Sequence, residues 1–133
     1  MEKDNIRLEV VTPEGQIFNE MVESVSVPAV IGSTGILYNH APLMSALEIG
    51  VVKYTCEGAV AKIAIGGGFM EVKDNEVMVL VKTAEKAEDI DLARAQNSLE
   101  RAMQRIQEHP GDTDIERAKI SLARAKARLA AKE

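Results

Sequence analysis

The sequence changes character between Thr83 and Asp89, and this change limits the chain to folds made of two unlike parts. Eight of the nine glycines lie before the change, whereas eleven alanines and only one glycine lie after it. Glycine is common where strands turn or bend, and alanine is the strongest helix former. We therefore predict a β-domain over residues 1–83, a linker over 84–88 and a helical domain over 89–133.

The first part carries the alternation of apolar and polar residues that is typical of half-buried strands. The pattern is clearest at residues 6–10, 21–27 and 76–81, and turn-forming clusters separate such stretches at short intervals. This spacing predicts about eight to ten short strands in an antiparallel sandwich or barrel. The glycines at 66–68 lack the lysine and following helix of a phosphate-binding loop, so we interpret them as a strand bend or bulge.

Two helices are predicted in the second part. The first spans residues 91–108, and after His-Pro-Gly at 109–111 the capping-box spacing of Thr113 and Glu116 begins the second. Their apolar stripes are Leu92, Leu99, Ala102, Met103 and Ile106 in the first helix, and Ile115, Ala118, Leu122, Ala125 and Leu129 in the second. We expect an antiparallel hairpin. Because alanine buries little apolar area, its packing is weak and the hairpin should be movable.

Composition excludes several classes of protein. The net charge is -5 and only 3% of residues are aromatic, which argues against a nucleic-acid-binding surface. The single cysteine, Cys56, cannot form an internal disulfide, and with His40 and His109 it is too little for a zinc site. Residues 1–5 lack the features of a signal peptide, and no apolar run reaches the ~18 to 20 residues of a membrane span. We expect a soluble, intracellular protein.

The arginines of the helical part are the one notable charge pattern. Arg94 and Arg101 share a face of the first helix, and Arg124 and Arg128 share a face of the second. If the hairpin turns near Gly111, Arg94 lies beside Arg128 and Arg101 beside Arg124. Such a group suits a phosphate-bearing ligand. On spacing alone, however, a solvated face is favoured, in which the arginines pair with nearby acids, namely Glu100, Glu108, Asp114 and Glu116.

The sequence does not indicate an active site. His40 has no serine, cysteine or carboxylate beside it in a nucleophile pattern, so we interpret it as a turn or core residue. The helical part lacks the phosphate-binding lysine and the carboxylate-held Mg²⁺ site that ATP-hydrolysing folds use. We predict a non-catalytic protein without a metal site or catalytic cofactor.

Three segments together resemble the epsilon subunit of the bacterial rotary (F-type) ATP synthase. They are Gly-Ile-Leu-Tyr-Asn-His-Ala-Pro-Leu at 35–43, Gly-Gly-Phe-Met-Glu-Val at 67–72 and Ile-Asp-Leu-Ala-Arg-Ala at 90–95. The resemblance implies a ten-stranded antiparallel β-sandwich that contacts the gamma subunit and the ring of c subunits and couples catalysis to proton or sodium translocation. It also implies a helical hairpin that either folds against the sandwich or extends into the alpha and beta subunits and inhibits ATP hydrolysis. The location would be peripheral, on the cytoplasmic face of the plasma membrane.

The last of these segments matches a motif with which some members of the family bind ATP on the folded hairpin. Carried over by position, the resemblance implies that one group of residues surrounds the adenine and ribose, namely Glu85, Ile90, Asp91 and Ala95. A second group would face the phosphates, namely Arg94, Arg101, Arg124 and Arg128. ATP would then be a regulatory signal that stabilises the folded hairpin. The alternative is a purely structural stalk subunit without ATP sensing.

Overall fold

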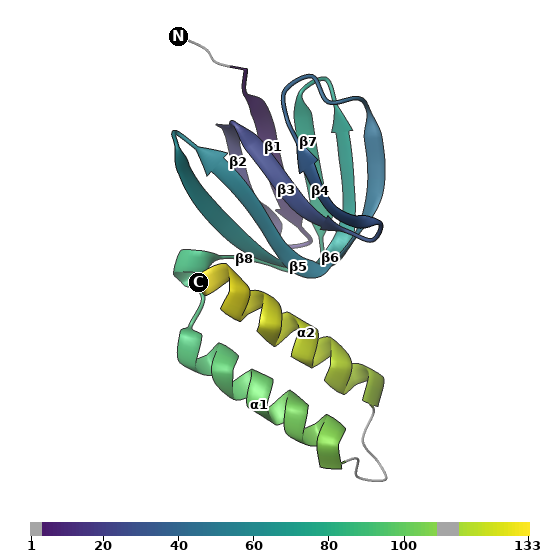
Figure 1. Ribbon diagram of the computed structural model, residues 1–133, viewed down its shortest axis with the longest axis vertical. Coiled ribbons are helices and arrows are strands. Elements are labelled where there is room, and N and C mark those ends of the chain that lie inside the picture. The colour runs from purple at the N-terminus through teal and green to yellow at the C-terminus, as the bar shows by residue number, and fades with distance from the viewer. Residues whose placement is uncertain (1–3, 109–114) are drawn as a thin grey trace.

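The computed structural model describes residues 4–108 and 115–133, which form a β-sandwich followed by two helices (Figure 1). The strands are β1 (Ile6–Thr12), β2 (Gly15–Val22), β3 (Ser24–Ala29), β4 (Gly32–Ile36), β5 (Leu43–Cys56), β6 (Ala59–Lys73), β7 (Glu76–Val81) and β8 (Ala84–Lys86). A short 3-10 helix, η1 (Ala87–Asp89), leads into α1 (Leu92–Glu108), and α2 (Ile115–Lys132) follows. The residues predicted as a linker thus form β8 and the beginning of η1.

The strands form one sheet in the order β2-β1-β7-β6-β5-β3-β4, with β8 also paired to β6. All pairs are antiparallel except β1 with β7, which is parallel, so the predicted all-antiparallel sheet is wrong at this pair. The structure has eight strands in the described residues, rather than the ten that the resemblance implied. The physical reason is that β5 and β6, with 14 and 15 residues, are continuous through a bend, so each is one strand where two shorter ones were expected.

The glycines of β6 make this bend. Leu47 pairs with Gly68 and Ile49 with Gly66, but Gly67, which has φ of 95°, is left out of the pairing. The register is the same on both sides of the gap, so no residue is inserted, and the feature is a bend and not a bulge. On its other edge β6 pairs first with β8 and then with β7, and the break between these two strands lies at the level of the same glycines. The sequence prediction of a bend is confirmed.

The sandwich core consists of alternate residues of the strands, with side chains such as Leu8, Val10, Val52 and Val79 fully buried. The predicted strand over residues 21–27 is wrong, because the chain turns at Glu23 between β2 and β3. Val22 is buried while Met21 is 37% exposed, and the buried positions then change from even numbers in β2 to odd numbers in β3. The adjacent apolar residues Met21 and Val22 are the sequence signal of this turn.

The helical hairpin is antiparallel, and α2 lies between the end of the sandwich and α1 (Figure 1). The helix–sheet interface is made mostly of small side chains: Ala127 and Ala131 pack with Ala64 and Ile90, flanked by Ile49 and Val51. For α1, the prediction that Leu92 and Met103 belong to the buried stripe is wrong, because these side chains are 53% and 52% exposed. Ala102, which belongs to the predicted stripe, is buried as expected, and Ala95, which does not belong to it, is buried as well. The helix stop at 109–111 and the capping-box Thr113 lie outside the described residues.

Candidate functional site

The residues predicted to bind ATP come from β8, from the connection before α1 and from both helices. Glu85 belongs to β8, Ile90 and Asp91 connect η1 to α1, and the others lie on the two helices, with Arg94, Ala95 and Arg101 on α1 and Arg124 and Arg128 on α2. Asp91 also begins α1, because its carboxylate accepts a hydrogen bond of 3.1 Å from the backbone N–H of Arg94.

Six of these eight residues line one pocket of about 140 Å³, which we call the central pocket. Its lining is Glu85, Asp89, Ile90, Asp91, Arg94, Ala95 and Arg128. Arg94 and Arg128 therefore lie on the same pocket, as the antiparallel register predicted. Asp89 was not among the predicted residues, although its place two residues before Asp91 in an acidic stretch could have indicated it.

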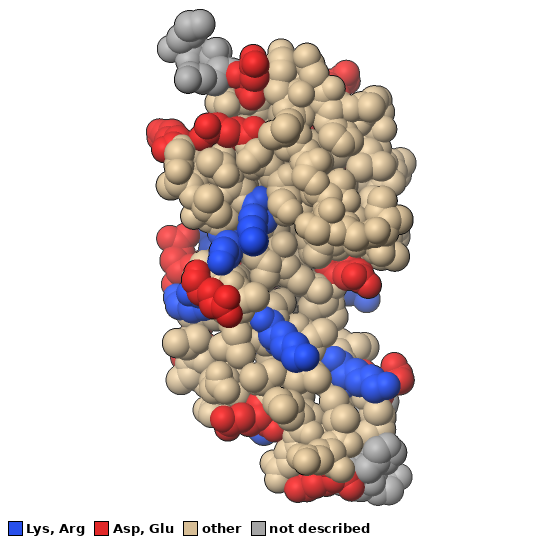
Figure 2. Space-filling model, viewed as in Figure 1, with Lys and Arg blue, Asp and Glu red and all other residues tan. Residues whose placement is uncertain are grey.

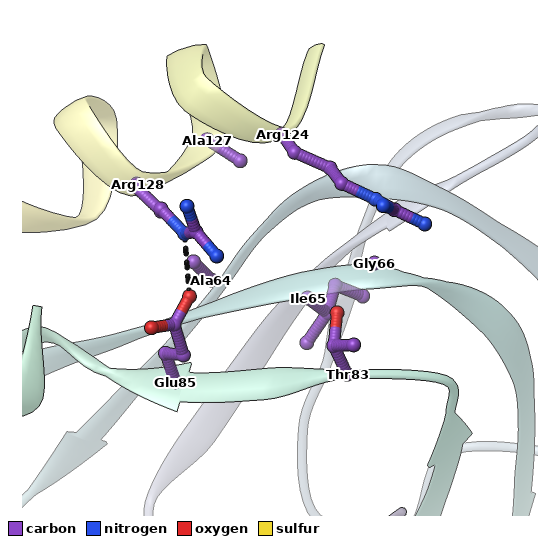
Figure 3. A pocket seen from close by; sticks show the side chains of 8 residues that line it. All are labelled: Ala64, Ile65, Gly66, Thr83, Glu85, Arg124, Ala127 and Arg128. Atoms are coloured by element: carbon purple, nitrogen blue, oxygen red, sulfur yellow. Dashed lines mark hydrogen bonds and ion pairs between the residues drawn. The ribbon is translucent and has the colours of Figure 1, made fainter. Parts of the chain in front are cut away.

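The other two predicted residues lie in neighbouring pockets. Arg124 lines the sheet-side pocket, which has a volume of about 20 Å³ and shares Glu85 and Arg128 with the central pocket (Figure 3). Its lining is Ala64, Ile65, Gly66, Thr83, Glu85, Arg124, Ala127 and Arg128. Arg101 lines the α1 pocket with Arg94, Asn97, Glu100 and Gln104. The four arginines are thus distributed over three pockets, and none of the three is lined by all of them.

Arg128 forms the main ionic contact between the hairpin and the sandwich. Its Nε donates to Glu85 Oε1 at 2.6 Å, and each side chain is 38% exposed (Figure 3). The sequence interpretation of arginines paired with acids at helical spacing is therefore wrong for Arg128, because its partner is on β8, 43 residues away. Half-exposed ion pairs contribute at most about 1 kcal/mol, so this contact holds the hairpin only weakly.

Two lysines also hold the end of α2. Lys132 Nζ donates to the backbone carbonyl of Ala87 at 2.8 Å, and Lys62 Nζ lies 3.4 to 3.5 Å from the carbonyl oxygens of Glu133 and Ala130. A cation near the carbonyl end of a helix is favourable because those groups carry partial negative charge. Figure 2 shows basic side chains on the visible face where the sandwich meets the hairpin.

The central pocket offers hydrogen-bonding partners of both kinds together with apolar surface. Its three carboxylates are hydrogen-bond acceptors, its two guanidinium groups are donors, and Ile90 and Ala95 supply apolar surface. In residues 4–108 and 115–133, no group of three His, Cys, Asp or Glu side chains is placed to hold a metal ion.

The other reactive residue types lie elsewhere. His40 is in an exposed turn, and its Nδ1 lies 2.7 Å from the carbonyl oxygen of Ala41. For Cys56, partial burial together with Glu57 raises the pKa of the thiol, which disfavours the reactive thiolate. Neither helix, over its described residues, is long and apolar enough to cross a bilayer.

Both parts of the chain match models of one class of proteins, the ATP synthase delta and epsilon chains. Residues 5–87 match the family model described as "ATP synthase, Delta/Epsilon chain, beta-sandwich domain", and residues 88–133 match "ATP synthase, Delta/Epsilon chain, long alpha-helix domain". Among bacterial relatives, the ATP synthase epsilon chain of Carboxydothermus hydrogenoformans is 54% identical over 103 residues, which cover 77% of each chain. That of Desulfitobacterium hafniense (strain Y51) is 51% identical over 104 residues, covering 78% of this chain and 79% of that one.

The chain belongs to the ATP synthase epsilon-chain family and is therefore a non-catalytic subunit of ATP synthase. A solved structure shares its fold: a chain in the cryo-EM structure of Euglena gracilis mitochondrial ATP synthase, OSCP/F1/c-ring in rotational state 1. That chain gives a TM-score of 0.85 with 24% identity, over all of this chain and 84% of the other. The prediction of this family from three short segments is confirmed.

Proposed function

We propose that the central pocket and the sheet-side pocket bind ATP as a regulatory signal that keeps the hairpin folded against the sandwich. The observation that carries the proposal is that six of the eight residues expected from the resemblance line one pocket, although they come from β8, the start of the hairpin and α2. Apolar surface with carboxylate acceptors suits a base and a ribose, and arginines suit phosphate oxygens. The ATP is bound as a ligand and is not hydrolysed by this chain.

ATP stabilises the folded hairpin because the site is complete only in that arrangement. Glu85 lies on the sandwich and Arg128 on α2, so moving α2 away divides the pocket. A ligand that binds only one of two states stabilises it by RT ln(1 + [L]/Kd), which is about 2.7 kcal/mol at a hundredfold excess over Kd. The hairpin is held by small side chains and half-exposed ionic contacts, so a stabilisation of this size is enough to shift its position.

The released hairpin extends along the gamma subunit toward the alpha and beta subunits and inhibits ATP hydrolysis. The basic residues of α2, including Arg117, Arg124, Lys126 and Arg128, then meet acidic segments of the beta subunit. The ATP hydrolysis rate of the assembled enzyme, with and without residues 89–133, measures this inhibition, and equal rates would contradict it. The mobile unit in this proposal is the predicted domain of residues 89–133, and the sandwich of residues 1–83 stays in place.

The sandwich has the coupling role. It contacts the gamma subunit and the ring of c subunits in the central stalk, and it transmits rotation between catalysis and proton or sodium translocation. The chain is then held at the cytoplasmic face of the plasma membrane through the complex. The second candidate, a purely structural stalk subunit, is favoured by one observation: the Arg128–Glu85 pair satisfies part of the site without any ligand.

Isothermal titration of the whole chain with ATP tests the proposal, with ADP titrated in parallel. The variant Arg94→Ala combined with Arg124→Ala removes one guanidinium from each of two pockets, and Arg105→Ala is the matched control because it removes an arginine of α1 that lines none of the three pockets. We expect saturable binding that the double variant loses and the control keeps. If the folded wild-type chain gives no heat up to millimolar ATP, ATP sensing is refuted and the structural subunit stands.

A further inference from the structure

The three pockets differ in charge, and the difference indicates where the phosphates of a nucleotide lie. The central pocket has three acids, Glu85, Asp89 and Asp91, against two arginines, so it has an excess of one negative charge. The sheet-side pocket has Arg124 and Arg128 against Glu85, an excess of one positive charge. The central pocket therefore suits the uncharged base and ribose, and the phosphates are drawn out of it toward a flanking pocket.

The sheet-side pocket is the better of the two flanking pockets. The α1 pocket also has one excess positive charge, but it is made by a single helix and shares only Arg94 with the central pocket. The sheet-side pocket shares both Glu85 and Arg128 with the central pocket and lies between α2 and the sheet. A phosphate bound there contacts both parts of the protein, which is what coupling to the hairpin position requires.

Two groups in the sheet-side pocket have unused hydrogen-bonding capacity. Within the part of the chain that the structure describes, neither the Arg124 guanidinium nor the Thr83 hydroxyl forms a hydrogen bond or ion pair. Figure 3 shows Arg124 extending from α2 across β6 above Gly66, and the Thr83 hydroxyl pointing toward the helix side of the sheet. Both are donors to an anion, and a hydrogen bond to a charged acceptor is stronger than one to a neutral acceptor.

We propose that the sheet-side pocket receives the terminal phosphate of the triphosphate and that the Thr83 hydroxyl donates a hydrogen bond to one of its oxygens. Thr83 thereby selects a nucleoside triphosphate over a diphosphate. The proposal rests on the ATP-binding function proposed above and adds a residue that the motif does not contain. With the base and ribose in the central pocket, the third phosphate is the group assigned to Arg124 and Thr83, so a diphosphate would leave both groups unused.

The size of the pocket fits one phosphate oxygen. A volume of about 20 Å³ is close to that of one water-sized group, so the oxygen enters while the phosphorus remains at the mouth beside the two arginines. Gly66 keeps this space open, because a Cβ there would collide with Oγ1 of Thr83. The break between β7 and β8 puts Thr83 at this level of the sheet, where its carbonyl accepts a hydrogen bond of 3.0 Å from the N–H of Gly66.

The test is titration of ATP and of ADP into the whole chain carrying Thr83→Val, which keeps the side-chain shape and removes the hydroxyl. Loss of a hydrogen bond to a charged group raises the Kd for ATP about tenfold or more, and we expect the Kd for ADP to stay the same. Thr83→Ser keeps a hydroxyl and should keep the wild-type preference. Thr34→Val is the matched control, because the Thr34 hydroxyl bonds to the Gly32 carbonyl in β4, away from the three pockets.

The outcomes separate this proposal from the one on which it rests. If wild-type protein binds ATP and Thr83→Val binds it equally well, the role of Thr83 is refuted while ATP sensing stands. If Thr83→Val weakens the binding of ATP and ADP equally, the hydroxyl does not recognise the third phosphate, and the proposal is refuted. The proposal is also refuted if Thr83→Ser weakens ATP binding. If folded wild-type protein binds no ATP, the proposed function fails first. A thermal melt of each variant confirms that it is folded.

Discussion

Replacing Gly68 by alanine tests whether the bend of β6 depends on a residue without a side chain. A Cβ at Gly68 would lie 2.8 Å from the Cα of Val81 and 3.0 Å from the carbonyl carbon of Leu80, and it would collide with the Leu80 carbonyl oxygen. All three atoms belong to the backbone at the end of β7, so no side-chain rotation relieves the contact. The two strands must separate where Gly68 pairs with Val81.

The magnitude follows from the rigidity of that neighbour. Overpacking a tight site costs about 1 to 3 kcal/mol, and contact with paired backbone corresponds to the upper end of this range. In a domain of this size, a loss of about 3 kcal/mol lowers the melting temperature by roughly 10 °C. Thermal unfolding followed by circular dichroism in the β-sheet band measures the change.

A second glycine serves as the matched control. Gly35 in β4 has no atom within 4 Å of the position that a Cβ would occupy and does not have positive φ, so Gly35→Ala should change stability by less than about 0.5 kcal/mol. The reasoning is refuted if Gly68→Ala melts within about 2 °C of wild type while Gly35→Ala behaves as expected. In that case β6 and β7 would be able to adjust at the bend.

Two further predictions concern the hairpin and the cysteine. Ala127→Leu places a larger side chain against Ala64, and this overpacking destabilises the docked hairpin by about 1 to 3 kcal/mol. The hairpin should therefore undock, so that trypsin cleaves faster after Lys86 and ATP hydrolysis by the assembled enzyme slows. The same change at exposed Ala93 should have neither effect, and equal cleavage of both variants would contradict the docking argument. The raised pKa of Cys56 predicts slower alkylation by iodoacetamide near neutral pH than for a cysteine peptide, with a rate that rises as the pH approaches that pKa. A rate equal to that of the peptide would contradict this prediction.

Local pattern was sufficient to predict much of the fold. Alternating residues located β1 and β7, the glycine run located the bend in β6, and the alanine-rich half located both helices. Each of these features depends on residues close together in the chain. The predictions failed where tertiary contacts determine the structure. At Glu23 a turn interrupts an alternation that is continuous in the sequence. Leu92 was expected in the buried stripe from helical spacing, but α2 covers a different face of α1.

For the candidate site, too, some features could be predicted from local sequence and others depend on tertiary contacts. The motif at 90–95 is local and could be found from the sequence alone, but the sequence placed Asp91 inside the first helix, whereas the structure places it before α1 as the cap. The pairing of Arg128 with Glu85 depends on how α2 is rotated on the sheet, which no spacing within α2 reveals. Thr83 is a further case: it stands in no motif, and only the pairing of its segment with β6 brings it opposite Gly66 and beneath Arg124.

The sequence by itself determined the division into a β-part and a helical part, the family, and the residue types available to a phosphate-bearing ligand. It did so because periodicity, glycine and alanine act through the local backbone. The tertiary structure decided which of the arginines share a pocket, how large each pocket is, and which neighbour each side chain contacts. These depend on packing between distant segments, where small interfaces of alanine and glycine let the helix and the sheet approach closely.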